Sequence, residues 1–186
     1  NIVNSHSHDL TSTIAAISSE GFGSGHAYMT NTIIERTSTL PASSPVIFSD
    51  VYFAVTNCTF RDNVAGTGVF TAYQATGNFT DSQVLSTTTS AAVVNYVAAL
   101  GIVARNLFTQ TTQAYVTLDT VTALTVYDYS NVLVTDNIFQ DNNGPVCSSI
   151  MVLRSMAEIS GNTFKNNRQN DNTPSLCILD APWDGY

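Results

Sequence analysis

Charged side chains are scarce in this sequence: they make up 11% of the 186 residues, and only six of them are basic. With a net charge of −8, six scattered Lys and Arg residues cannot form a track for phosphates, so we expect no nucleic-acid partner. Attraction to anionic lipid is disfavoured for the same reason. The scarcity of charge does not indicate disorder, because 44% of the residues are hydrophobic. That is enough for a sizeable core in one domain spanning residues 1–186.

Long apolar runs are also lacking. The longest run, residues 91–104, has 14 residues and contains Asn95, whereas a membrane span needs about 20. We therefore expect no membrane span. The sequence has neither an initiator Met nor a signal peptide, so we expect a mature product, a processed piece or a segment of a longer chain.

One four-residue phrase occurs three times, beginning each time with Phe and ending in Asn. The copies are Phe60-Arg61-Asp62-Asn63, Phe139-Gln140-Asp141-Asn142 and Phe164-Lys165-Asn166-Asn167. Phe79 and Phe108 lie between the first two copies, so the series 60, 79, 108, 139, 164 has a mean step of 26 residues. Ile33 and Val3 extend it backwards. Self-similarity at about 20 to 50 residues predicts a solenoid, because each unit must bury its apolar face against its neighbours.

Short extended segments separate these phrases. Val51–Val55 and Asn131–Val134 are examples of apolar or β-branched runs bounded by Asn, Asp and Gly, which are typical of strands. We predict an all-β, single-domain parallel β-helix of six to seven coils with three short strands per coil, best supported over residues 25–180. A β-sandwich is the alternative, but hairpin signals are scarce, and Asn143-Gly144 is the one internal case.

Side chains alternate across a strand, so an inward Phe60 places Cys58 inward and Asn57 outward. The same parity places an Asn inside the coil two residues before three of the Phe anchors: Asn106, Asn137 and Asn162. We expect these amides to form a ladder from coil to coil, interrupted at Cys58. The rings of Phe60, Phe79, Phe108, Phe139 and Phe164 should stack beside it.

Two acceptor sequons for N-glycosylation are present, Asn57-Cys58-Thr59 and Asn78-Phe79-Thr80. Parity turns both asparagines outward, where a glycan can be attached. We therefore expect an extracellular or cell-surface, secreted glycoprotein that carries N-glycans.

The repeat resembles the right-handed parallel β-helix repeats of secreted and surface proteins. It is most similar to the Phe-x-x-Asn repeats of polymorphic outer-membrane proteins and, more generally, to the pectin-lyase-like fold. The resemblance implies the fold. It implies no activity, because lyases, glycosidases, tailspikes, adhesins and inert fibres all use this architecture.

Only three cysteines are present. Cys147 and Cys177 occupy like places in successive coils, each shortly after a Pro. Neighbouring coils lie about 4.8 Å apart, a separation that a disulfide tolerates, so we predict a Cys147–Cys177 bridge, with two buried thiols as the alternative. Cys58 is left over and should pack inside as a small hydrophobe.

No metal or cofactor is expected. His6, His8 and His26, with Asp9, could hold zinc, but a segment so rich in Ser and Asn is better interpreted as a solvated arm. Calcium is the alternative at the Asx-rich turns of residues 141–143 and 166–172. Self-bonded Asx turns are the preferred interpretation, because dense, spaced acids are lacking.

Catalysis on this fold needs paired carboxylates, or a base beside an Arg, on one face of the stack. Asp62 and Asp81, with Arg61 and Arg105 in the same region, form the single pair worth naming. We expect the protein not to be an enzyme.

The sequence favours a non-catalytic structural or adhesive protein that stacks end to end into a filament or array. Trp183 and Tyr186, in an aromatic end loop at 181–186, would lie at the junction between copies or neighbouring domains. The alternative is a carbohydrate-binding or polysaccharide-cleaving β-helix. Its stacking platforms would be tyrosines expected on the surface: Tyr28, Tyr73, Tyr96, Tyr115 and Tyr127.

Overall fold

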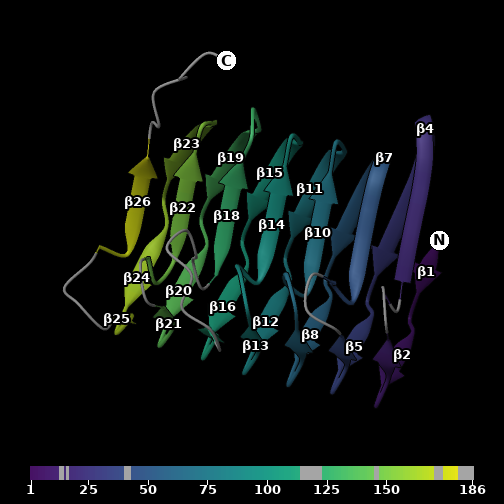
Figure 1. Ribbon diagram of the computed structural model, residues 1–186, viewed down its shortest axis with the longest axis horizontal. Coiled ribbons are helices and arrows are strands. Elements are labelled where there is room, and N and C mark those ends of the chain that lie inside the picture. Colours follow the sequence, from purple (N-terminus) through teal and green to yellow (C-terminus); the bar gives the residue numbers. More distant parts are fainter. Residues whose placement is uncertain are drawn as a thin grey trace.

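The computed structural model describes residues 1–12, 15, 17–39, 43–113, 123–144, 147–169 and 174–179. Over these residues the chain forms a parallel β-helix of about six turns, in which strands from successive coils lie side by side along the long axis (Figure 1). The predicted fold class is therefore confirmed. The β1 end and the β26 end lie at opposite ends of the stack.

Two of the three sheets contain short strands, one from each coil. We call the first sheet B: β2 (His6–His8), β5 (Ile33–Glu35), β8 (Thr59–Arg61), β12 (Gln83–Leu85), β16 (Leu107–Thr109), β20 (Ile138–Gln140) and β24 (Thr163–Lys165). The second is sheet C: β3 (Thr11–Ser12), β6 (Ser38–Thr39), β9 (Val64–Ala65), β13 (Thr88–Thr89), β17 (Thr112–Gln113), β21 (Asn143–Gly144) and β25 (Arg168–Gln169).

Sheet A forks. It begins with β1 (Ile2–Val3), β4 (Ile17–Thr30) and β7 (Val46–Thr56), and β7 pairs with both β10 and β11. The first branch contains β10 (Phe70–Tyr73), β14 (Val94–Val97), β18 (Leu124–Tyr127), β22 (Ile150–Leu153) and β26 (Leu176–Leu179). The second branch contains β11 (Thr76–Thr80), β15 (Leu100–Ala104), β19 (Asn131–Thr135) and β23 (Met156–Ser160). The predicted three strands per coil thus become four from β10 onward.

The bends before and after sheet B each use one residue with positive φ. Before sheet B these residues are Asn4, Asn31, Asn57, Asp81, Arg105, Asp136 and Gly161, and after it they are Asp9, Arg36, Asp62, Ser86, Gln110, Asp141 and Asn166. Asn and Asp tolerate this left-handed conformation better than most residues, which explains much of the Asn and Asp content of the turns. From β5 to β20, the residue after each of these bends is buried in the coil.

The inward column of sheet B differs in part from the predicted Phe series. Its members are Ile34, Phe60, Val84, Phe108, Phe139 and Phe164. Phe79 instead lies in β11, level with Val55 and Val103. The extension to Ile33 and Val3 is wrong, because Ile33 pairs with Thr59 and Val3 with Thr30.

Phe79 nevertheless joins the aromatic stack. Its ring centroid lies 5.7 Å from that of Phe60 and 6.4 Å from that of Phe108, so it fills the space left by the smaller Val84. The stack continues from Phe108 to Phe139 at 4.9 Å and from Phe139 to Phe164 at 5.3 Å. Close packing of the core is thus kept where the repeat changes residue.

The predicted disulfide is confirmed: Cys147 and Cys177 are bonded, with their Cα atoms 6.2 Å apart. Cys58 is free and buried, and burial raises the pKa of its thiol. The part of the chain that the structure describes contains no helix capable of crossing a membrane. The end loop at 181–186, with Trp183 and Tyr186, lies outside the described residues.

Candidate functional site

The first candidate is an internal ladder of amides at the bend before sheet B. The backbone N–H and the Nδ2 of Asn106 both donate to Oδ1 of Asn137, each at 3.0 Å. Asn137 donates in the same way to Oδ1 of Asn162, each at 2.9 Å. Ser82 N–H donates to Oδ1 of Asn106 at 2.9 Å, and Cys58 N–H donates to Oγ of Ser82 at 3.1 Å. The three predicted asparagines are therefore linked from coil to coil, and the ladder continues to Cys58 through a hydroxyl.

The second proton of each amide is also used. Nδ2 of Asn137 donates to the carbonyl oxygen of Val103 at 2.8 Å, one coil earlier. Asn106 and Asn162 make the equivalent bonds to Phe79 and Val134. A buried amide with all its donors satisfied stabilises the bend instead of penalising it.

A second ladder lies at the bend after sheet B, and the sequence interpretation missed it. Thr111 N–H donates to Oδ1 of Asn142 at 3.1 Å, and Asn142 N–H donates to Oδ1 of Asn167 at 3.1 Å. Asn63 accepts from Thr37 N–H at 3.0 Å in the same way. The signal was present, since the last residue of each copy of the repeated phrase is this Asn.

This ladder contains two asparagines of the turns that the sequence offered as calcium sites. Asn142 and Asn167 use their side-chain amides inside the coil, with Nδ2 donating to Phe108 and Phe139 carbonyls. Residues 170–172 lie outside the described part of the chain.

Arginine side chains tie neighbouring coils together on the outside. Arg105 donates from Nε and Nη2 to the two carboxylate oxygens of Asp81 at 2.6 and 2.7 Å. Arg154 Nη2 donates to Asp128 at 2.6 Å. Two further pairs of this kind, Arg36–Asp9 and Arg61–Glu35, lie near the β1 end. Each pair joins residues 24 to 27 positions apart, which is one coil.

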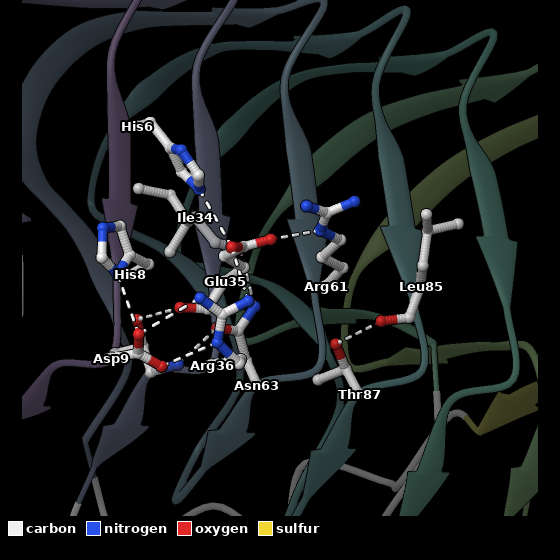
Figure 2. Close-up of polar contacts among 11 residues, drawn as sticks. His6, His8, Asp9, Ile34, Glu35, Arg36, Arg61, Asn63, Leu85 and Thr87 are labelled. Atoms are coloured by element: carbon white, nitrogen blue, oxygen red, sulfur yellow. Dashed lines mark hydrogen bonds and ion pairs between the residues drawn. The ribbon is translucent and has the colours of Figure 1, made fainter.

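The Glu35 cluster (His6, His8, Asp9, Glu35, Arg36 and Arg61) is the densest group of charged side chains (Figure 2). The Glu35 side chain is only 3% exposed. Its carboxylate accepts from Arg61 Nε, from Arg36 Nη1 at 2.6 Å and from His6 Nε2 at 3.0 Å. The hydrogen bond from Arg61 lowers the pKa of this carboxyl, against the opposing effect of burial. Glu35 is therefore held as an anion by partners from two neighbouring coils.

The cluster corrects the predicted solvated arm. His6–His8 form β2, which pairs in parallel with β5, so this segment is part of sheet B. His8 Nδ1 lies 2.8 Å from Asp9, whose carboxylate also accepts from Arg36 Nε and Nη2 at 2.7 and 3.1 Å. Arg36 thereby holds the pKa of Asp9 well below its usual range.

The zinc alternative does not assemble. His26 stacks against Tyr52 with ring centroids 5.4 Å apart. His6 and His8 are directed to Glu35 and Asp9 respectively. Across the described ranges, no group of three or more His, Cys, Asp and Glu side chains could hold a metal ion.

Asp62 and Asp81, the pair of acids considered for catalysis, are not brought together either. Asp81 precedes β12 at the first bend, where it is bound by Arg105. Asp62 follows β8, so it lies at the bend after sheet B, at the opposite end of the sheet B strands from Asp81. Arg61 is committed to Glu35.

The two sequon asparagines are both exposed. Asn57 occupies a positive-φ bend, and its Nδ2 donates to Oδ1 of Asn31 at 2.7 Å. Asn78 lies in the middle of β11, on the outer surface of the second branch of sheet A. Glycan attachment at both positions stays a prediction.

A groove runs along the outside of the first branch of sheet A. One part, of about 500 Å³, is lined by residues of β7, β10, β14 and β18 and of the turns before them: Ser44, Ile47, Thr67, Thr71, Tyr73, Ala91, Asn95, Val97 and Tyr127. A second part, of about 280 Å³, shares Ala91, Asn95, Val97 and Tyr127 and continues to Met151 and Leu153. The groove therefore crosses the strands and follows the axis of the solenoid.

The predicted tyrosine platforms divide between surface and core. Tyr73 and Tyr127 line the groove, and Tyr28 is exposed elsewhere. Tyr96 was expected on the surface, but it is fully buried among Phe53 and Phe70, and burial raises the pKa of its phenol. Tyr115 lies outside the described residues.

A scan against models of protein families, and searches among curated proteins and solved structures, found no match to this chain.

Proposed function

We propose that the chain is a non-catalytic structural element of an extracellular glycoprotein, a stiff solenoid that associates through its ends into a filament or array. The observation that carries this proposal is that four arginines form ion pairs between neighbouring coils. Arg36, Arg61, Arg105 and Arg154 are each bound to a carboxylate of the preceding coil. Side chains that could have bound an anionic substrate instead hold one coil to the next.

The internal contacts support the same role. Two amide ladders and an aromatic stack run parallel to the axis, so each coil is bonded to both neighbours by backbone, side chain and core. In a solenoid, stability is the sum of such nearest-neighbour contacts. A tube built in this way resists bending and separation of its coils.

The β26 end of the stack supports the proposed association. Within the described residues, no strand pairs with the outer edges of β23, β24 and β25. Met156, Phe164 and Ile178 expose apolar surface there, and Ile178 is 67% exposed. Unpaired strand edges beside apolar side chains favour the addition of another strand layer, and the proposed layer is the β1 end of a second copy.

The extracellular location is also part of the proposal. The Cys147–Cys177 disulfide favours an oxidising compartment. Exposure of Asn57 and Asn78 leaves both sequons accessible to glycan transfer.

Sedimentation velocity over a range of concentrations, with negative-stain electron microscopy, tests the association. We expect the chain to form linear oligomers and Ile178→Lys to abolish them, because a Lys at the end buries a charge in the contact. Ile138→Lys is the matched control: Ile138 is 43% exposed on the side of the tube, in β20. A chain that stays monomeric at every concentration, or equal effects of the two variants, would contradict the proposal.

A further inference from the structure

We propose that the groove on the first branch of sheet A binds a neutral oligosaccharide along the solenoid axis. This inference goes beyond the structural role and does not depend on end-to-end association. It rests on the shape of the groove, on the chemistry of its lining and on one amide whose orientation is fixed.

The groove has the dimensions of an extended ligand. Ile47, Thr71, Asn95, Thr125 and Met151 are consecutive partners across five adjacent strands. At about 4.8 Å per strand, they span roughly 20 Å. Tyr73 and Tyr127 are two strands apart in the neighbouring column, a separation of roughly 10 Å. This matches the distance between alternate rings of an extended β-linked sugar chain.

The lining carries no charge, although the chain has a net charge of −8. It combines the exposed ring of Tyr73 and the half-buried ring of Tyr127 with hydroxyl and amide groups. The pyranose ring of a sugar offers C–H groups that pack on an aromatic face, and hydroxyl groups that bond to the polar side chains beside it. Arg154, which contacts Tyr127 beside the groove, is already paired with Asp128, so a neutral glycan fits this lining better than a charged polymer does.

Asn95 supplies an acceptor at the centre of the groove. The residue is 9% exposed and lines both parts of the groove. Both protons of its Nδ2 are used, by the carbonyl oxygens of Thr67 at 2.8 Å and Ala92 at 3.0 Å. These bonds fix the orientation of the amide beside the groove. A fixed amide whose oxygen can accept a hydrogen bond suits a donor brought by a ligand, and a sugar hydroxyl is such a donor.

A hydroxyl cluster extends this polar floor. Oγ of the buried Ser44 lies 2.9 Å from Oγ1 of Thr67 and 2.7 Å from Oγ1 of Thr71. Mutual bonding fixes the orientation of these hydroxyls before any ligand arrives. A fixed polar floor with an exposed ring beside it, from Tyr73, lowers the entropy cost of binding.

Tyr73 is the best residue for the test. Its side chain is 45% exposed, and its hydroxyl has no bond to any described residue, so Tyr73→Ala removes a platform without breaking a contact of the fold. Tyr127 is less suitable because it contacts Arg154 through its hydroxyl and its ring. Tyr52→Ala is the matched control. Tyr52 is 50% exposed, but it lies in the part of β7 that pairs with the second branch of sheet A, where it stacks on His26, and it does not line the groove.

Isothermal titration with neutral β-linked hexasaccharides of glucose, mannose and xylose tests the inference on the intact chain. We expect at least one to bind, Tyr73→Ala to weaken that binding about tenfold, and Tyr73→Phe and Tyr52→Ala to leave it unchanged. Binding should be insensitive to added salt, because no ion pair forms.

Three outcomes would overturn the inference. These are no binding of any neutral hexasaccharide, tighter binding of oligogalacturonate or of an extended peptide, and equal losses in Tyr73→Ala and Tyr52→Ala. None of them bears on the sedimentation test, so the two proposals can fail separately.

Discussion

At the scale of the residue, the inward asparagines link neighbouring coils at the bends, as backbone hydrogen bonds do along the strands. Asn137 is fully buried. Its Oδ1 accepts from Asn106, and its Nδ2 donates to Val103 and Asn162. Every donor of the amide is therefore satisfied in a place that water does not reach.

Asn137→Ala should lower the free energy of unfolding by about 2 to 4 kcal/mol. The substitution leaves the N–H of Asn106 buried without its partner and removes the bonds from Asn137 to Val103 and Asn162, and each unmade bond costs about 1 to 3 kcal/mol. Urea unfolding followed by circular dichroism measures the change. Asn143→Ala is the control, because Asn143 is exposed in β21, and it should change stability by less than about 0.5 kcal/mol. Similar losses in the two variants would contradict the ladder.

Parity from the Phe anchors predicted the inward asparagines before sheet B, because side chains alternate along a strand. It missed those after sheet B, where a positive-φ residue breaks the alternation. Apolar character alone failed at Ile33 and Val3. The column member is Ile34, followed by Glu35, the positive-φ Arg36 and the inward Thr37. Ile34-Glu35-Arg36-Thr37 therefore corresponds to the repeated phrase Phe60-Arg61-Asp62-Asn63. The correspondence is hard to see in the sequence because the residue types differ.

At the scale of the element, β26 is one of the end strands of the stack. It pairs only with β22, and the described part of the chain offers it no second neighbour in sheet A. The Cys147–Cys177 bridge joins this strand to the turn before β22. The disulfide is therefore placed where the stack would otherwise fray.

Reduction of the bridge should loosen β26 while the middle of the stack stays protected. We expect hydrogen exchange at the amides of β26 to accelerate by the equivalent of about 2 to 4 kcal/mol in opening free energy, and that of β12 and β16 to stay unchanged. Cys177→Ser should reproduce the effect and abolish any further response to reductant. Uniform acceleration along the chain would show that the bridge stabilises the whole fold.

The fork of sheet A and the placement of β2 could not be predicted from the sequence. The extra bends have positive φ at Gln74, Ala98, Tyr129 and Arg154, residue types that give little signal for this conformation, and Asp128 alone is of a favoured type. The segment at His6–His8 looked solvated because its own composition is polar. Its partners Glu35 and Arg36 come from the next coil, so only tertiary context reveals the strand.

At the scale of the whole molecule, the charges act between coils. Asp9, Glu35 and Asp81 each have a pKa below the ordinary value, in each case chiefly through a hydrogen bond from an Arg. An unfolded chain then binds more protons than the folded chain in the acid range. Stability from these groups is present above the ordinary carboxyl pKa, about 4, and is lost as pH falls through the folded values.

The free energy of unfolding should therefore fall steadily as the pH is lowered below about 5. Glu35→Gln should lower stability near neutral pH and make the acid decline shallower, because the carboxylate that holds Arg61 and Arg36 is gone. Glu158→Gln is the control, since Glu158 is exposed and makes no ion pair with a described residue. Chemical unfolding at a series of pH values gives the slopes, and the idea fails if Glu35→Gln leaves the acid slope unchanged.

The overall fold was predictable because coils that stack must bring like residues into register, and a repeat of about 26 residues records that demand in the sequence. The groove was not. Tyr73 and Tyr96 look alike as sequence, yet Tyr73 faces out at the end of β10, while Tyr96 continues the inward column of Ala72 and Val126. Only the register between coils separates a surface ring from a core ring.

Every described strand pairing in this solenoid is parallel, so the tube has a direction and its two ends are chemically different. In the proposed association an end of one kind meets an end of the other kind, and each such contact leaves one end of each kind free. Growth of this heterologous type has no built-in stopping number, in contrast to a two-fold dimer, which uses up its contact surface. The length of any polymer made by these units must therefore be set from outside, by a capping segment, a bulky sugar at the junction or the supply of subunits.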